Sequence, residues 1–187
     1  IVAHHSATHL LHAALREVLG THVEQKGSLV NAEGLRFDFS HGEPITAEQI
    51  MRVENIINAN VMRNLPVVIE QMSIDAAKAK GAMALFGEKY GDVVRVVDMG
   101  DASIELCGGI HVQRTGEIGF IKVVSDGAVA SGIRRVEAVA GVKALTYVQQ
   151  QDAQLGTLAN SFKVSRDKVM DRIDAMTQQI KSLEKQL

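Results

Sequence analysis

The stretch ELCGGIH, residues 105–111, contains the only cysteine of the chain, and His111 follows Cys107 by four positions. Gly108 and Gly109 stand between them, and adjacent glycines disfavour a helix by about 1 kcal/mol each relative to alanine. They favour a tight loop in which the backbone approaches a ligand closely. A single cysteine cannot form a disulfide within the chain, so we expect a reducing compartment and hence a cytoplasmic location.

A histidine pair stands near the start of the chain. His5 and His9 are four residues apart, so on a helix their imidazoles share one face, an arrangement that can hold a metal ion with two nitrogens. Together with Cys107 and His111 they supply the ligand types that zinc prefers. We therefore predict a zinc site, which requires the N-terminal helix and the glycine loop to meet in the fold.

Each half of this pattern also has a simpler interpretation. A histidine pair on an amphipathic helix can be polar surface, and a single cysteine is often a small core residue. The general base of an H-E-x-x-H peptidase is missing because Ser6 follows His5, and there is no G-x-S-x-G motif. A cysteine–histidine nucleophile pair is a further alternative, but a spacing of four in a glycine loop places it poorly and no third orienting residue is evident.

The hydrophobic pattern predicts helices and strands mixed without a regular βαβ repeat. Helix patterns occur at residues 6–19, ended by Gly20, at residues 44–66, opened by a capping box of Thr46 and Gln49, and at residues 75–87, interrupted by Gly81 and Gly87. Strand patterns occur at residues 21–31, 35–40, 67–73, 92–99, 120–125 and 133–141, the first two forming a hairpin across residues 31–34. We therefore predict an α+β fold, an antiparallel sheet packed with helices.

Composition changes after Gly141, where the chain becomes rich in glutamine and lacks proline. We predict one domain over residues 1–141 and a helical extension over residues 142–187, with Ser165 capping its second helix. Apolar residues then recur at spacings of four and three, which is a heptad seam: Val169, Ile173, Met176, Ile180, Leu183 and Leu187. A coiled-coil stalk, which can also self-associate, is preferred over an amphipathic helix lying on its own domain.

Net charge is −2, so bulk electrostatics do not favour nucleic-acid binding, and no apolar run approaches the roughly 18–20 residues that span a membrane. Any RNA contact must come from a local basic patch.

Arg134 and Arg135 are adjacent on a strand and face opposite sides of the sheet. We assign Arg135 to the RNA and expect the other arginine to pair with Glu137 or Asp126. Three lysines can add to a basic rim or form an ordinary mixed-charge surface: Lys78, Lys80 and Lys89.

Five blocks of this sequence occur together in a known order: HSATHLLHAALREVLGTHVEQKGSLV, LRFDFSH, AKGAMALFGEKYG, ELCGGIH and IRRVEAVAG. They resemble the editing domain of bacterial alanyl-tRNA synthetase over residues 1–141, and the following helices are similar to the start of that enzyme's C-terminal linker. Freestanding alanyl-tRNA editing proteins and the editing domain of threonyl-tRNA synthetase are similar in their paired H-x3-H and C-x3-H motifs. The AKGAMALFGEKY block and the coiled-coil continuation favour the synthetase, as do the missing initiator methionine and the open-ended heptads.

The resemblance implies an aminoacyl-tRNA deacylase that hydrolyses the ester of tRNA(Ala) wrongly charged with serine or glycine, within a longer ATP-binding ligase. It assigns zinc to the same four residues. It also implies a pocket glutamine at Gln25 and, at Thr8, a threonine that senses the serine hydroxyl. The family's usual C-G-G-T-H is C-G-G-I-H here, so Ile110 removes a hydroxyl without altering a metal ligand.

We hypothesise that zinc, held in part by Cys107, positions the substrate and orders the loop at Gly108 and Gly109, whose backbone N–H groups steady the oxyanion. Glu105 is a candidate base, although a salt bridge at a strand edge fits it better. Four protein ligands are typical of a closed, structural zinc site, whereas catalytic zinc usually has three and a water. Two alternatives therefore remain, a structural zinc or tRNA-binding module without catalysis and a freestanding trans-editing deacylase.

Overall fold

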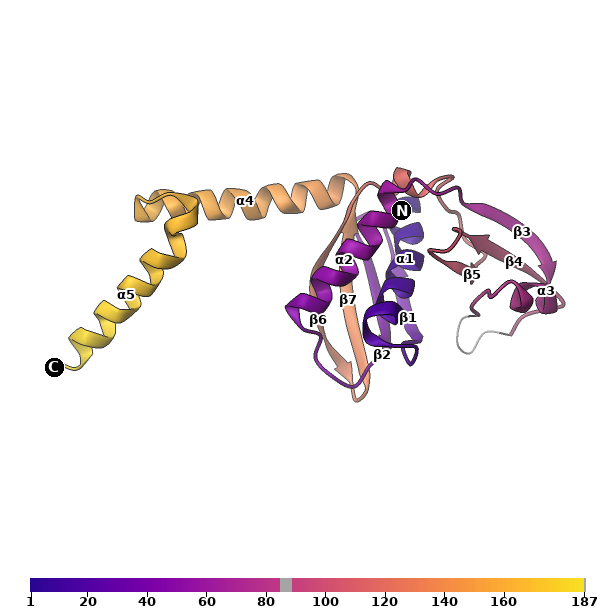
Figure 1. The fold of residues 1–187 in the computed structure, drawn as a ribbon, viewed down its shortest axis with the longest axis horizontal. Helices are drawn as coiled ribbons and strands as arrows, with labels where there is room; N and C mark the ends of the chain where they lie inside the picture. The colour runs from indigo at the N-terminus through magenta and orange to yellow at the C-terminus, as the bar shows by residue number, and fades with distance from the viewer. Residues whose placement is uncertain (85–88, 187) are drawn as a thin grey trace. The chain divides into compact units, whose positions relative to one another are not determined.

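The computed structural model describes residues 1–84 and 89–186, and the chain divides into two compact units, Ile1–Ala144 and Leu145–Leu187 (Figure 1). The first unit contains both the histidine pair and the cysteine loop. Gly87, a predicted helix breaker, and Leu187, the last predicted heptad position, lie outside the described residues. The predicted α+β fold class is confirmed.

A four-stranded antiparallel sheet forms the centre of the first unit, with strand order β1-β2-β7-β6. Its strands are β1 (Gln25–Val30), β2 (Leu35–Ser40), β6 (Ile121–Ala130) and β7 (Ile133–Ala140). The hairpin predicted across residues 31–34 is confirmed, because Val30 pairs with Leu35. The side chain of Asn31 closes the turn by accepting hydrogen bonds from the backbone N–H groups of Glu33 and Gly34, at 2.8 and 3.0 Å.

Two helices, α1 (Val2–Leu19) and α2 (Ala47–Met62), pack against each other and cover one face of this sheet (Figure 1). The predicted stripe on α1 is buried, with Leu11 and Leu15 fully inaccessible to solvent, and the capping box at the start of α2 is confirmed. α1 begins earlier than the predicted residue 6. Its first turn is fixed by buried His4, which bonds to the carbonyl of Asn31 at 2.9 Å and the N–H of Ala140 at 3.1 Å.

The remaining strands form a second, three-stranded antiparallel sheet in place of the single sheet that the pattern predicts. It contains β3 (Val68–Ser73), β4 (Val93–Asp98) and β5 (Ile104–Leu106), with the short helix α3 (Ile74–Ala79) packed on it. A separate small core underlies these elements: Ala77, Val94, Val96 and Leu106. β5 leads into the cysteine loop, and the 3-10 turn η1 (Thr115–Ile118) follows that loop.

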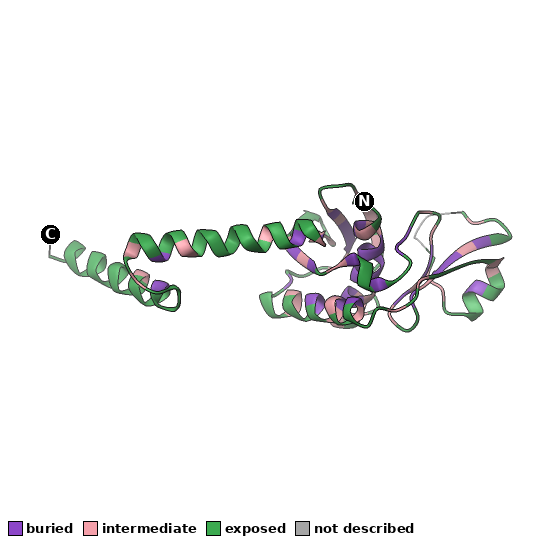
Figure 2. Ribbon diagram, turned by 90° about the horizontal axis from the view of Figure 1, so that it is seen from above, coloured by how far each residue is buried: buried purple, intermediate pink, exposed green. Residues whose placement is uncertain are grey.

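The second unit contains most of α4 (Val142–Phe162), the 3-10 turn η2 (Arg166–Lys168) and α5 (Val169–Glu184). The prediction that Ser165 caps the last helix is wrong, because its side chain makes no capping bond and a 3-10 turn precedes α5. Most of α4 and α5 is exposed (Figure 2). Along the heptad seam Val169 is buried, whereas Ile180 and Leu183 are 54% and 52% exposed. The coiled coil and its self-association stay predictions.

Among the described residues, no helix combines the length and apolar character that crossing a bilayer requires.

Candidate metal centre

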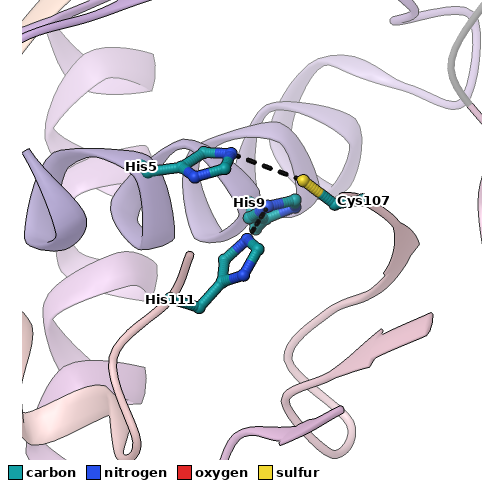
Figure 3. Close-up of side chains that lie close together, drawn as sticks. All are labelled: His5, His9, Cys107 and His111. Atoms are coloured by element: carbon teal, nitrogen blue, oxygen red, sulfur yellow. Dashed lines mark hydrogen bonds between the residues drawn. The ribbon is translucent and has the colours of Figure 1, made fainter. Parts of the chain in front are cut away.

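Four side chains from two distant segments converge at the surface of α1. His5 and His9 project from one face of the helix toward Cys107 and His111, which lie at the two ends of the glycine loop (Figure 3). One nitrogen from each imidazole and the thiol sulfur all lie within 4.8 Å of one another. The meeting of the two halves, on which the predicted metal site depends, is therefore present in the fold.

The cysteine loop reaches α1 because of the alternation of side chains along β5. Leu106 is buried in the small core of the second sheet, and Ile104 packs against that core. Glu105 and Cys107 point to the opposite side, as residues two apart on an extended chain do. Glu105 there contacts His9, and Cys107 packs against the core of the first unit.

Main-chain hydrogen bonds attach the loop to α1. The N–H of Val112 donates to the buried hydroxyl of Ser6 at 3.0 Å, and Nδ1 of His5 bonds to the carbonyl of Ile110 at 3.1 Å. The side chain of Ile110 is 74% exposed, so only its main chain takes part. The departure from the family's threonine at this position thus leaves the contact with α1 intact.

Arg95 on β4 supports the same loop from the other side. Its Nη1 donates to the carbonyls of Cys107 and Gly109 at 2.8 and 2.6 Å, and its own carbonyl accepts the N–H of Cys107 at 3.1 Å. Gly109 also lies against the imidazole of His5, where a Cβ atom would be 2.0 Å from Cε1. A Cβ at Gly108 would have no neighbour within 4 Å. Steric crowding therefore explains why residue 109 is glycine, but not why residue 108 is.

Hydrogen bonds define which nitrogen each histidine offers. Nδ1 of His5 faces a carbonyl, and Nδ1 of His9 faces the Glu105 carboxylate at 3.3 Å, so both Nδ1 atoms carry hydrogen. Nε2 of each is then the nitrogen with a lone pair available for a metal ion. It lies 3.4 Å from the Cys107 sulfur for His5 and 2.9 Å from Nε2 of His111 for His9. Nδ1 of His111 is buried without a partner among the described residues.

The cluster holds two anionic groups next to its imidazoles. Burial alone raises the pKa of the Cys107 thiol, but hydrogen bonds from His111, His5, His9 and the Gly109 N–H lower it to about 3. Burial likewise raises the pKa of Glu105, but bonds from His12 and His9 lower it to about 2.

The imidazoles respond in opposite directions. Burial lowers the pKa of His9, yet its bonds to Cys107 and Glu105 outweigh this and raise it to about 9. Burial also lowers the pKa of His111, and repulsion from His9 adds to that effect although Cys107 acts against it. The Cys107 thiolate and the Glu105 carboxylate therefore stabilise a positive charge at His9, and the same two anions would favour a bound metal cation.

Thr8 and Gln25 lie on different elements near this centre. Thr8 is buried on α1, and its hydroxyl donates to the carbonyl of His4 at 2.9 Å, which leaves the oxygen's lone pairs as acceptors. Gln25 is half-buried at the start of β1 and lines a pocket of about 200 Å³ with His12 and Arg16. The four predicted metal ligands come together, whereas Thr8 and Gln25 lie outside the cluster.

The two strand arginines both have carboxylate partners. Arg135 forms a two-bond ion pair with Asp38, at 2.8 and 2.9 Å, and Arg134 bonds to Asp126 at 3.0 Å as one of the expected pairings. The side chain of Arg135 remains 34% exposed, so contact with RNA stays a prediction. Of the three rim lysines, Lys80 pairs with Glu70 and Asp98.

The salt bridge expected for Glu105 at a strand edge is present. Its carboxylate is buried on β5, the last strand of the second sheet, and two imidazoles share it, His9 at 3.3 Å and His12 at 3.4 Å. Two further residues of the site, His12 and Arg95, were missed in the sequence. Glu105 and Cys107 are two apart in a strand, and His9 and His12 are three apart on a helix. Both spacings place the two side chains on one face, and they could have predicted that Glu105 and His12 lie next to the cluster. Arg95 had no local signal, because its role depends on pairing between strands.

Comparison with known proteins gives two concordant matches. Residues 94–137 match the family model described as the threonyl and alanyl tRNA synthetase second additional domain. The chain is 59% identical over 184 residues to an alanine–tRNA ligase of Pseudomonas fluorescens and 59% identical over 183 residues to that of Hydrogenovibrio crunogenus. Each match covers 98% of this chain and 21% of the relative, so the chain spans about a fifth of the length of these ligases.

The ligase of Pseudomonas syringae pv. tomato gives the same result, with 57% identity over 184 residues. The family match covers β4, β5, the cysteine loop and β6, and therefore includes Cys107 and His111. The resemblance to bacterial alanyl-tRNA synthetase is confirmed: nearly the whole chain is similar to about a fifth of those ligases, and residues 94–137 match the family described as the threonyl and alanyl tRNA synthetase second additional domain.

Proposed function

We propose that this chain is the editing segment of an alanine–tRNA ligase and hydrolyses the ester of tRNA(Ala) mischarged with serine or glycine. The observation that carries the proposal is the convergence of His5, His9, Cys107 and His111 in a chain with this similarity. The match to a domain described for both threonyl and alanyl tRNA synthetases supports it. The partners are mischarged tRNA(Ala) and the rest of the parent synthetase chain, in the cytoplasm.

Physical limits on recognition explain why such a site is needed. A pocket built for alanine excludes larger amino acids by size, but one methylene or hydroxyl is worth only about 1–3 kcal/mol in an apolar site. Serine and glycine therefore escape a single selection step. A second pocket with polar groups can hold the serine hydroxyl and reject alanine, whose methyl leaves those groups unpaired.

The donor set fits zinc. Three imidazole nitrogens and one thiolate are ligands that zinc prefers. Their largest separation of 4.8 Å is about 1 Å wider than the roughly 3.3–3.8 Å between atoms bonded tetrahedrally at about 2.0–2.3 Å, so binding draws the side chains slightly inward. The Glu105 carboxylate and the Ile110 carbonyl supply the outer hydrogen bonds that orient ligating histidines in metal sites. When bound, zinc polarises an ester carbonyl or lowers the pKa of a bound water.

The residues around the metal ligands then have separate tasks. Thr8, whose hydroxyl hydrogen is used by the His4 carbonyl, offers lone pairs to the hydroxyl of a seryl group. Gln25 presents an amide that can both donate and accept. The N–H of Gly109 is directed at the Cys107 thiolate, so we assign the oxyanion contact to the N–H of Gly108.

A structural metal module without catalysis is the alternative, and the presence of four protein ligands favours it. Deacylation of seryl-tRNA(Ala) by the full chain, with alanyl-tRNA(Ala) as the control substrate, separates the two. The proposal requires release of serine but not alanine, and loss of that activity in Cys107→Ala and Gln25→Ala. A Cys107→Ala protein that deacylates at the full rate, or a wild-type chain that deacylates neither substrate, contradicts it.

A further inference from the structure

His12 is a buried histidine outside the metal cluster with one nitrogen unaccounted for. The residue is only 3% exposed, and its Nε2 has no hydrogen-bond partner among the described residues. A buried polar atom without a partner costs about 1–3 kcal/mol, so folded proteins rarely retain one without a reason. The packing of the ring against Phe37, with centroids 5.2 Å apart, explains its position but not this nitrogen.

The other nitrogen of His12 fixes the orientation of the ring. Nδ1 lies 3.4 Å from Oε2 of Glu105, whose second oxygen lies 3.3 Å from Nδ1 of His9. Because a carboxylate only accepts hydrogen bonds, Nδ1 of His12 carries the hydrogen, and in the neutral ring Nε2 is a bare acceptor. One carboxylate therefore links a metal ligand to an imidazole that offers an unused lone pair.

His12 lines the pocket of about 200 Å³ that also contains Gln25, Arg16 and Met83. The pocket lies between α1 and the start of β1, on the part of α1 that follows His9. Arg16 already donates to the carbonyls of Thr21 and Val23, at 2.8 and 2.7 Å, and so shapes the wall. Glu24 also lines the pocket, but its carboxylate is paired with Lys26 at 3.1 Å, so we assign a small hydrogen-bond donor to His12 and the Gln25 amide.

We propose that Nε2 of His12 accepts a hydrogen bond from an O–H or N–H donor of the aminoacyl end of the substrate, seated in this pocket beside Gln25. His12 is then a substrate-contacting residue, and Glu105 is the positioning residue that orients it and His9 together. This inference rests on the proposed deacylase function. The donor is a group that seryl and glycyl substrates share, such as the ammonium or a ribose hydroxyl, because the single O–H of serine is assigned to Thr8.

Two substitutions separate contact with the substrate from a purely structural role. In His12→Asn the side-chain amide can replace Nδ1 and keep the bond to Glu105, but nothing replaces Nε2. In His12→Gln the longer side chain can replace Nε2 and loses the bond to Glu105. His22→Asn is the matched control, since His22 lies in an exposed pair with His41 and belongs to neither site.

Deacylation of seryl- and glycyl-tRNA(Ala) by the 187-residue chain is measured for all four proteins, together with zinc content and thermal unfolding. We expect His12→Asn to lower kcat/KM about 10- to 100-fold with unchanged zinc content and melting temperature, and His12→Gln to retain more activity than His12→Asn. We expect an equal loss on both substrates, and a loss confined to seryl-tRNA contradicts a shared donor.

The inference is overturned if His12→Asn matches the wild type and His12→Gln loses activity. That result would show that deacylation depends on Nδ1 of His12 and its bond to Glu105, and not on Nε2. It is also overturned if both variants lose zinc or unfold in parallel with activity. In each of these cases the active wild-type chain leaves the proposed function standing. An inactive wild-type chain instead removes the proposed function, and this inference with it.

Discussion

The Nε2 atoms of His9 and His111 lie 2.9 Å apart in a buried contact between residues 102 positions apart in the sequence. Two imidazole nitrogens at this distance share a proton in an N–H···N hydrogen bond, because facing lone pairs repel each other. The Cys107 thiolate and the Nε2 atom of His5 lie beside this pair. The convergence of these four side chains carries the metal-site proposal, and the first three predictions below test it.

Zinc is expected to stabilise the chain through His9. Free zinc at 100 times its Kd adds about 2.7 kcal/mol to a protein that binds it only when folded. After treatment with a chelator, the melting temperature of the wild type should therefore rise when zinc is restored, whereas that of His9→Ala should not. His22→Ala, which alters a histidine outside the cluster, is the control and should respond as the wild type does. An equal rise in His9→Ala speaks against the site.

Glu105→Gln is expected to weaken zinc binding about 10- to 100-fold, the usual effect of removing a group that orients a ligating histidine. The variant keeps the size of the side chain but loses the charge that accepts hydrogen from both His9 and His12. Competition with a coloured chelator measures the affinity. Glu70→Gln removes an exposed carboxylate paired with Lys80 and should leave the affinity unchanged. Equal affinities in the two variants refute the role given to Glu105.

The two loop glycines should differ in their tolerance of alanine. A Cβ at Gly109 would lie 2.0 Å from Cε1 of His5, so Gly109→Ala must displace this ligand and reduce zinc affinity. Gly108 has no atom within 4 Å of the same position, and Gly108→Ala should keep the wild-type affinity. Isothermal titration with zinc compares the two proteins. The reverse order of affinities is incompatible with this loop geometry.

Thr8→Val should affect serine more than glycine. Valine keeps the shape of the side chain but removes the oxygen whose lone pairs we assign to the serine hydroxyl. We expect about a tenfold fall in kcat/KM for seryl-tRNA(Ala), the effect of one lost hydrogen bond, and little change for glycyl-tRNA(Ala). The glycyl substrate also controls for damage to the fold, since damage would lower both rates. A parallel fall removes Thr8 from the specificity site.

The ion pair of Asp38 and Arg135 should make stability depend on pH. The hydrogen bonds from Arg135 lower the pKa of Asp38 below its ordinary value of about 4. The stabilisation is therefore present above about pH 4 and is lost as pH falls toward the lowered folded-state pKa. Thermal unfolding should show the wild type melting above Asp38→Asn at pH 7, with the difference shrinking below about pH 4. A difference that is constant from pH 7 to pH 3 contradicts this assignment.

Local spacing in the sequence was enough to predict several features. The heptad and helix periods, the capping box at Thr46 and the hairpin turn at Asn31 each depend on residues within a few positions of one another. The four side chains that converge could also be named, because each pair is four residues apart and the chain has one cysteine. Spacing of this kind is fixed by the covalent chain, so it can be read without knowing the fold.

Only the tertiary structure decided which partners these side chains have. The second sheet brings Arg95 to the carbonyls of the cysteine loop, and β2 brings Asp38 to Arg135, so that one arginine supports the candidate site and the other is held in an ion pair. Glu105 faces α1 because of its place in β5, where it orients His9 and His12. These contacts join residues from 12 to 97 positions apart, and their free energies depend on burial and strand register, neither of which is fixed by local sequence.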